Sequence, residues 1–140
     1  MEYINKMNLK FVSLSENESF ARLAVASFCA NQVKSIEILA DIKTAVSEAV
    51  TNCIVHAYDY KNDGIVEIEC ILTENQVLID VVDYGNGIKN IDEARMPFYT
   101  TKPDMERSGM GFTVMEGFMD NVLIESTIGK GTKITLIKNI

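Results

Sequence analysis

Residues 79–88 read I-D-V-V-D-Y-G-N-G-I, an apolar stretch that runs into an acidic residue and then into two glycines. A strand suited to a core therefore ends in Asp83, although a buried carboxylate is unfavourable unless it is paired. Glycine, here at Gly85 and Gly87, weakens a strand unless the backbone must bend or closely approach something. A ligand that donates a hydrogen bond to Asp83 and lies against the backbone would account for both features.

The composition predicts one domain over residues 1–140. The chain has 140 residues, of which 47% are hydrophobic, and this is enough to bury one core. Twenty acidic against thirteen basic residues give a net charge of −7, which argues against non-specific binding to nucleic acid or to an anionic membrane. No N-terminal signal and no uncharged apolar run of about 18 residues occurs, so we expect a cytoplasmic protein. Cys29, Cys53 and Cys70 lie among apolar residues and are expected to be buried, reduced thiols.

The periodicity of apolar residues predicts an α+β fold, a two-layer sandwich of a mixed, largely antiparallel sheet with three helices on one face. The expected strands are 8–14, 65–72, 76–84, 122–127 and 132–138. The expected helices are 15–31, 36–58 and 108–119, the first of them starting with a capping box of Ser15 and Glu18. Residues 85–108 contain both prolines and no period, and are expected to form a long loop of the kind that is functional or disordered.

Polar side chains follow one face of the second expected helix. Glu48, Asn52 and His56 are spaced at i, i+4 and i+8, so they lie beside the apolar stripe. A carboxylate, an amide and an imidazole in a row can accept a proton, bind a metal or contact phosphate. A solvated helix face is the alternative interpretation. A zinc site of two histidines and a glutamate is excluded, because the chain has one histidine.

Two further glycine pairs interrupt the second half of the chain. In E-R-S-G-M-G-F, residues 106–112, the glycines precede a helix, and free N–H groups at a helix start bind anions. An ordinary cap by Ser108 is the alternative. No G-K-[ST] follows, so this is not a Walker A loop. The pair in T-I-G-K-G-T, residues 127–132, is adequately explained as a hairpin turn.

Taken together, the motifs resemble a known superfamily. E-A-V-T-N-C-I-V-H-A-Y, D-Y-G-N-G-I, S-G-M-G-F and G-K-G-T are similar, in this order over residues 48–132, to the N, G1, G2 and G3 boxes of the GHKL superfamily of ATP-binding domains. The whole chain, including S-E-N-E-S-F-A-R and F-Y-T-T-K-P, most closely resembles the anti-sigma F factor family of endospore-forming bacteria. Members of that family are serine kinases that also bind a sigma factor.

The resemblance assigns a nucleotide site for ATP or ADP with Mg²⁺. It implies that Asp83 accepts a hydrogen bond from the exocyclic amine of adenine, with Thr132 joining this contact, commonly through water. Asn52 matches the Mg²⁺ ligand that holds the triphosphate oxygens. Gly85 and Gly87 would let the loop pass close to the nucleotide. The implied phosphate contacts are Ser108, Gly109, Met110 and Gly111 at the helix start, with Thr100, Thr101 and Arg107 in a lid at about 95–108.

The resemblance also implies a reaction and partners. Glu48 matches the general base that accepts the proton of a substrate serine, although related proteins use the same glutamate to activate water. Arg22 matches an arginine that contacts both the sigma factor and an anti-anti-sigma antagonist, which is the serine substrate. From the residues alone, Arg22 is better explained as a solvated arginine. A homodimer is implied, with no direct contact to nucleic acid or membrane.

Three other functions remain open at this point. A general-stress anti-sigma serine kinase shares the boxes and the mechanism. A nucleotide-gated binding protein without phosphotransfer would use Asp83 and Asn52 but not the basicity of Glu48. A detached catalytic domain of a histidine kinase is disfavoured, because the chain has no dimerisation helix bearing a phospho-accepting histidine.

Overall fold

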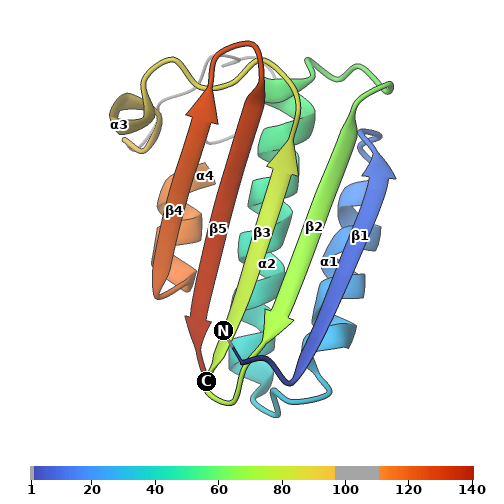
Figure 1. The fold of residues 1–140 in the computed structure, drawn as a ribbon, viewed down its shortest axis with the longest axis vertical. Coiled ribbons are helices and arrows are strands. Elements are labelled where there is room, and N and C mark those ends of the chain that lie inside the picture. The colour runs from blue at the N-terminus through green and yellow to red at the C-terminus, as the bar shows by residue number, and fades with distance from the viewer. Residues whose placement is uncertain (1, 97–110) are drawn as a thin grey trace.

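The computed structural model describes residues 2–96 and 111–140. A five-stranded sheet with the order β1-β2-β3-β5-β4 forms one layer, and the helices lie on one of its faces (Figure 1). The strands are β1 (Asn5–Val12), β2 (Ile65–Leu72), β3 (Gln76–Asp83), β4 (Asn121–Thr127) and β5 (Gly131–Asn139). The helices are α1 (Asn17–Cys29), α2 (Ile36–Asn52), the short α3 (Ile91–Ala94) and α4 (Gly111–Phe118), with a π-helix, η1 (Cys53–Ala57), following α2. The predicted α+β sandwich is confirmed, and the four strand pairings described are all antiparallel.

Strict alternation along the central strands builds the core. On β3 the side chains of Val77, Ile79 and Val81 are buried beneath the helices, whereas the residues between them face the uncovered side. On α2 the buried residues recur at helical spacing, as expected from the apolar stripe. The predicted β2–β3 hairpin is confirmed by a register that pairs Leu72 with Val77. No helix in the described part of the chain is long and apolar enough to cross a membrane.

The cysteines are buried and unpaired by disulfides, as the sequence predicted. The sulfur atoms of Cys29 and Cys70 lie 3.8 Å apart, where the last residue of α1 meets β2. Cys53 lies at the start of η1. Each thiol therefore fills space between the helical layer and the sheet.

The second helix does not continue as a regular α-helix to Tyr58, contrary to the expectation for residues 36–58. From Cys53 the chain widens into η1, and the N–H of Tyr58 bonds the carbonyl oxygen of Cys53, five residues earlier. Single π-helical turns are frequent at functional sites. Apolar spacing carries no signal for such a turn, because the buried residues still fall on one side.

The predicted capping box of α1 is wrong. The helix begins at Asn17 after Glu16, and no side chain caps it. The N–H of Glu18 bonds the main-chain oxygen of Ser15 in a turn, and the side chain of Asn17 reaches back to the carbonyl of Val12. The first N–H groups of the helix are therefore satisfied by main-chain carbonyls of the preceding turn and not by a side-chain cap.

The expectation that residues 85–108 form a loop without regular structure is wrong at one place. The short helix α3 lies within this segment, and the side chain of Asn90 accepts a hydrogen bond from the N–H of Glu93 at 3.0 Å. Asparagine three residues before a glutamate is a local start signal for a helix, and it marks α3 in the sequence.

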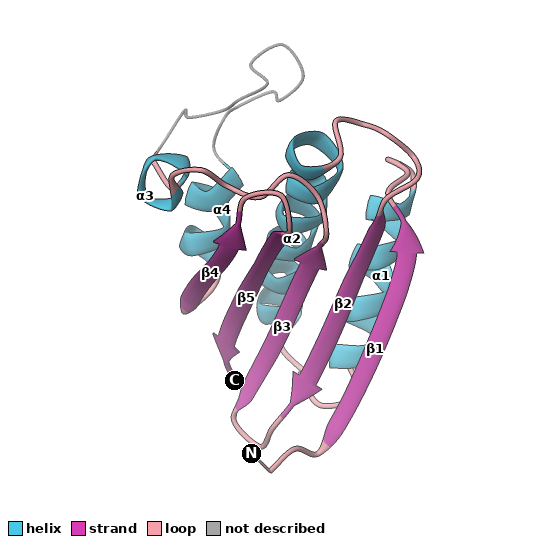
Figure 2. Cartoon of the chain, turned by 45° about the horizontal axis from the view of Figure 1, so that its top comes forward, coloured by secondary structure: helices cyan, strands magenta, loops and turns pink. Residues whose placement is uncertain are grey.

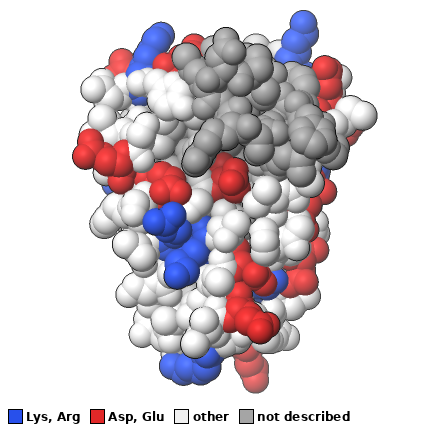
Figure 3. Space-filling model, turned by 180° about the vertical axis from the view of Figure 1, so that it is seen from behind, with Lys and Arg blue, Asp and Glu red and all other residues white. Residues whose placement is uncertain are grey.

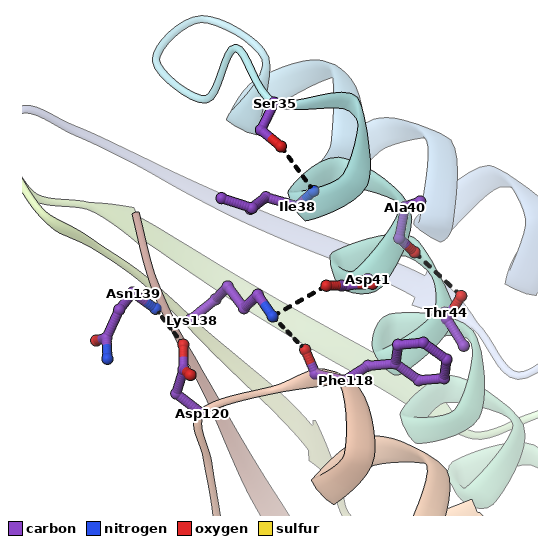
Figure 4. A network of polar contacts seen from close by, with 9 residues as sticks. All are labelled: Ser35, Ile38, Ala40, Asp41, Thr44, Phe118, Asp120, Lys138 and Asn139. Carbon is purple, nitrogen blue, oxygen red and sulfur yellow. Dashed lines mark hydrogen bonds and ion pairs between the residues drawn. The ribbon is translucent and has the colours of Figure 1, made fainter.

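A polar network ties the helical layer to the sheet at the end where α2 begins (Figure 4). The ammonium group of Lys138 on β5 donates to Asp41 of α2 at 3.0 Å and to the carbonyl oxygen of Phe118, the last residue of α4, at 2.6 Å. The side chain of Lys138 is 14% exposed. One largely buried amine thus caps α4 and joins it to α2.

Replacing Lys138 with methionine removes both contacts while keeping most of the apolar stem. We expect a loss of about 1–3 kcal/mol in the free energy of unfolding, because the Asp41 carboxylate and the Phe118 carbonyl lose their partner. Urea denaturation measures this. Lys6→Met is the matched control, since Lys6 pairs with Glu69 at 3.7 Å on the exposed side of the sheet, and its loss should cost no more than about 0.5 kcal/mol. Equal losses in the two variants would contradict the assignment.

Candidate functional site

The end of the sheet at which β3 stops gathers the segments that the sequence singled out. The chain following β3, the turn between β4 and β5, and the end of the α2–η1 helix meet there, as Figure 2 shows with this end brought forward. Asp83 lies at the centre of this group and is 2% exposed. Its Oδ1 accepts hydrogen bonds from the N–H of Gly85 at 3.1 Å and from the N–H of Thr132 at 3.2 Å. One carboxylate oxygen therefore holds the start of the G1 loop to the start of β5.

The other oxygen of Asp83 is not satisfied within the protein. Oδ2 is buried and makes no hydrogen bond to any residue that the structure describes. Burial raises the pKa of Asp83 above its ordinary value, against the opposing effects of the Gly85 N–H, the Cys53 thiol and the Thr132 N–H. An unsatisfied buried acceptor costs free energy that a donor from a ligand or an ordered water recovers. This is the place where the residues present fit an amine donor such as that of adenine.

The loop at residues 84–88 lies between η1 and the β4–β5 turn, and Asn86 makes hydrogen bonds to both. Its main-chain N–H donates to the carbonyl of Ala57 at 3.2 Å, and its side-chain amide donates to the carbonyl of His56 at 3.4 Å. Its carbonyl accepts from the N–H of Gly129 at 2.8 Å. The π-helical turn thus presents its last carbonyl groups to this loop. The motif D-Y-G-N-G contained this residue, but sequence reasoning gave it no role.

The glycines of the site are explained by contacts within the protein. A Cβ at Gly85 would collide with the carbonyl oxygen of Ala57, and a Cβ at Gly87, whose φ is +78°, would collide with that of Thr127. A Cβ at Gly131 would collide with the carbonyl oxygen of Asp83. Close backbone approach was expected, and the structure identifies main-chain groups as the neighbours. The predicted passage of Gly85 and Gly87 beside a nucleotide stays a prediction.

Ser126 is a site residue that the sequence reasoning missed. Its hydroxyl accepts from the N–H of Ile88 at 2.6 Å and lies 2.8 Å from the hydroxyl of Thr132. Thr132 is 4% exposed; its main-chain N–H bonds Asp83, while its hydroxyl contacts Ser126. A shallow groove of about 240 Å³ borders this end of the sheet, but its wall also contains Val82, Glu125 and Lys133 and no residue of α2 or η1, so it is distinct from the place where Asn52 and Glu48 lie. A serine in a strand gave no local signal, because its partner lies far away in the sequence.

Glu48 and Asn52 are half-buried side chains one helical turn apart on α2, and His56 follows in η1. Among the described residues no group of three or more His, Cys, Asp or Glu side chains could hold a metal ion by itself. Mg²⁺ is commonly bound through one or two protein oxygens together with substrate phosphates and water. The amide oxygen of Asn52 fits that role, and Glu48 supplies a carboxylate on the same face.

The predicted lid is described only at its beginning. Thr100, Thr101, Arg107, Ser108, Gly109 and Met110 lie outside the described residues, so their contacts remain predictions. Gly111 is the first residue of α4. Ahead of that gap, Arg95 donates to Glu116 of α4 at 3.2 Å and to the carbonyl of Val122 at the start of β4. The segment that enters the lid is therefore fixed to the two elements that follow it.

Arg22 lies on α1, away from Asp83 in sequence but linked to the helix of Glu48. Its guanidinium contacts Glu18 at 3.4 Å, Ser19 at 3.2 Å and Ser47 at 3.5 Å. Two large apolar side chains near it in the sequence of α1, Phe20 and Leu23, are 51% and 56% exposed. Arg22 is held by these polar contacts, and exposed apolar side chains occur elsewhere around the same helix, so the exposed part of α1 offers both residue types that protein interfaces use.

Comparison with known proteins identifies the class. Residues 11–138 match the family model described as histidine kinase-like ATPase domain. The chain therefore belongs to the histidine kinase-like ATPase family, which agrees with the four predicted boxes. Within that class, it is similar over nearly its whole length to curated proteins named anti-sigma F factor. The chain belongs to the anti-sigma F factor family, and the predicted resemblance is confirmed.

Two relatives show the extent of this likeness. The anti-sigma F factor of Clostridium botulinum (strain Alaska E43 / Type E3) is 54% identical over 136 residues, which are 97% of this chain and 95% of that protein. The anti-sigma F factor of Caldanaerobacter subterraneus subsp. tengcongensis is 54% identical over 140 residues, 100% of this chain and 97% of that protein.

Solved structures confirm the fold. A structure of the RsbU and RsbW domains of Rv1364c from Mycobacterium tuberculosis matches 96% of this chain with a TM-score of 0.67 at 18% identity, and this chain spans 31% of that one. A histidine kinase domain from Erythrobacter litoralis EL346 matches 73% of this chain with a TM-score of 0.53 at 21% identity, and 44% of that chain is covered. At these identities the likeness concerns the fold alone.

Replacing Asp83 with asparagine tests the state of the buried carboxylate in the ligand-free protein. Because the pKa of Asp83 is raised by folding, the unfolded chain loses this proton at lower pH, and stability falls as pH rises from the unfolded to the folded pKa. The asparagine oxygen retains the two backbone hydrogen bonds without a charge. We therefore compare the free energy of unfolding of Asp83→Asn with that of the wild type by urea titration at several pH values. The difference, variant minus wild type, should become more positive as the pH is raised from about 3 to about 7. A difference independent of pH would contradict the raised pKa.

Proposed function

We propose that this chain is an ATP-dependent protein serine kinase that also binds and inhibits a sporulation sigma factor. The observation that carries the nucleotide assignment is Asp83, buried at the end of β3 with one oxygen held by two N–H groups and the other unsatisfied. Membership of the histidine kinase-like ATPase family supports ATP as the ligand. The names of the relatives support the sigma factor as a partner.

In this proposal each described site residue has one task. Asp83 accepts a hydrogen bond from the exocyclic amine of adenine, and Thr132 supports this contact. Asn52 holds Mg²⁺, which neutralises charge on the triphosphate. Gly111 lies at the N-terminus of α4, where free N–H groups and the helix dipole favour the phosphates.

Glu48 is the proposed general base. The oxygen of a substrate serine attacks the γ-phosphorus, the bond from that phosphorus to the β–γ bridging oxygen breaks, and the serine proton passes to the Glu48 carboxylate. The products are phosphoserine and ADP. A glutamate is a weak base at neutral pH, so positioning of the serine supplies much of the rate.

The substrate serine belongs, in this proposal, to an anti-anti-sigma antagonist that competes for the surface around Arg22. Leu23, the next residue on α1, offers exposed apolar area for that contact, and Arg22 supplies hydrogen bonds. The helix-bearing side carries acidic and basic side chains intermixed rather than a field of one sign (Figure 3). Such a surface suits a protein partner with mixed charges better than a polyanion. The acting form is proposed to be a cytoplasmic homodimer.

The first experiment measures transfer of label from γ-labelled ATP with Mg²⁺ to an antagonist protein from the same organism. We expect phosphoserine on the antagonist, and Glu48→Gln should lower the rate by about 10²-fold or more, because a glutamine accepts no proton. ATP affinity, measured by calorimetry, should change little in this variant.

Absence of label with wild-type protein, while nucleotide and sigma factor still bind, would leave a nucleotide-gated binding protein. Full activity of Glu48→Gln would remove the base assignment but retain the kinase. A general-stress sigma factor bound in preference to the sporulation one would favour the related general-stress kinase.

The partner surface is tested by Arg22→Ala. We expect affinity for the sigma factor and the antagonist to fall about tenfold to hundredfold, since arginines at the centre of an interface contribute strongly, and affinity for ATP to stay unchanged. Lys10→Ala, on the edge strand β1, is the control and should leave partner binding intact. Loss of ATP binding in Arg22→Ala would show that this arginine acts on the nucleotide site instead.

A further inference from the structure

Tyr58 occupies a position between β2 and β3 to which the sequence analysis gave no role. It follows the π-helix η1 directly. Its hydroxyl donates to the carbonyl oxygen of Ile65 at 2.6 Å and accepts from the main-chain N–H of Tyr84 at 2.7 Å. Both partners are main-chain groups, one at the start of β2 and the other directly after β3.

This hydroxyl replaces a direct backbone hydrogen bond between β2 and β3. The pairing of β2 with β3 ends at Val66 and Asp83, and the next pair in the same register would be Ile65 with Tyr84. The Tyr58 oxygen bridges these two residues instead. A bridging oxygen holds two strands further apart than a direct N–H···O=C bond does. The chain therefore leaves β2 at the residue that follows Asp83.

The surroundings fix the ring of Tyr58 in this position. A Cβ at Gly64 would lie 2.6 Å from the ring, so only glycine leaves room for it. The next residues, Asp59 and Tyr60, have φ values of 52° and 61°. The left-handed conformation is unfavourable for a bulky residue such as Tyr60, and it persists where surrounding contacts determine the path of the chain. Burial raises the pKa of the Tyr58 hydroxyl, so it remains protonated and can donate to Ile65.

We propose that Tyr58 is a positioning residue for base recognition, and this inference rests on the proposed adenine contact of Asp83. By bridging Ile65 and Tyr84, its hydroxyl sets where the chain turns, and with it the place of the Asp83 carboxylate and of the Gly85 N–H bonded to it. Tyr58 does not touch the nucleotide in this proposal. It determines how well the Asp83 oxygen faces an amine donor.

The experiment compares the affinities of Tyr58→Phe and of the wild type for ATP and for inosine triphosphate, both with Mg²⁺. Inosine carries a carbonyl oxygen where adenine carries the amine, so the wild type should bind ATP more tightly. Tyr58→Phe keeps the ring and removes the bridge. We expect ATP affinity to fall about tenfold while inosine triphosphate affinity is unchanged, so that discrimination decreases by the same factor. Tyr3→Phe, which removes a hydroxyl from an exposed ring near the N-terminus, should retain full discrimination.

The outcomes separate this inference from the proposed function. If the wild type itself does not discriminate, the adenine contact of Asp83 is wrong, and the inference is overturned with it. If the wild type discriminates and Tyr58→Phe does so equally well, the inference alone is overturned. An equal loss for both nucleotides would also overturn it, because a general loss of structure predicts that result. Should Tyr58→Phe fail to fold, Gly64→Ala decides in the same way, since the added methyl group displaces the ring while the hydroxyl is kept.

Discussion

The hydrogen bonds to Oδ1 of Asp83 determine the arrangement of one whole end of the molecule. The N–H of Gly85 and the N–H of Thr132 reach one buried oxygen from two different segments. Because of this, the chain after β3 must turn back sharply, and β5 must begin close beside it, where Gly131 removes the side chain that would obstruct the approach. The π-helical turn and Ser126 then hold the loop from two sides. Protein contacts thus satisfy one oxygen of the carboxylate and leave Oδ2 without a hydrogen bond among the described residues.

The two-layer fold follows from local patterns of apolar residues that can be recognised in the sequence. Val77, Ile79 and Val81 alternate with partly exposed residues, as a strand with one buried face requires. The apolar stripe of α2 has the helical period, and its start at Ile36 follows Ser35, whose side chain accepts from the N–H of Ile38. The unusual environment of Asp83, buried at the end of β3, was also predictable, because an acidic residue at the end of an apolar strand contradicts the pattern around it; its contact with a nucleotide stays a prediction.

Other features depend on partners distant in the sequence, and local patterns gave no indication of them. The capping box at Ser15 was wrong, because the main-chain carbonyl of Ser15, and not its side chain, accepts from the N–H of Glu18. Ser126 and Tyr58 look like ordinary polar residues until the strands that they join are placed side by side. Likewise, the widening of the helix at Cys53 leaves the buried positions on one side, so periodicity could not detect it.

The three buried thiols lie in two separate regions of the interior, and their reactivity can therefore be used to monitor each region separately. Cys53 lies next to Asp83, while Cys29 and Cys70 lie together between α1 and β2. A buried thiol reacts with an alkylating reagent only when its surroundings open, so the rate of modification at each cysteine reports how often that region opens. The chain therefore contains two built-in reporters, one for the end of the sheet at which Asp83 lies and one for the helix that bears Arg22. Mass spectrometry could follow both without introducing a single substitution.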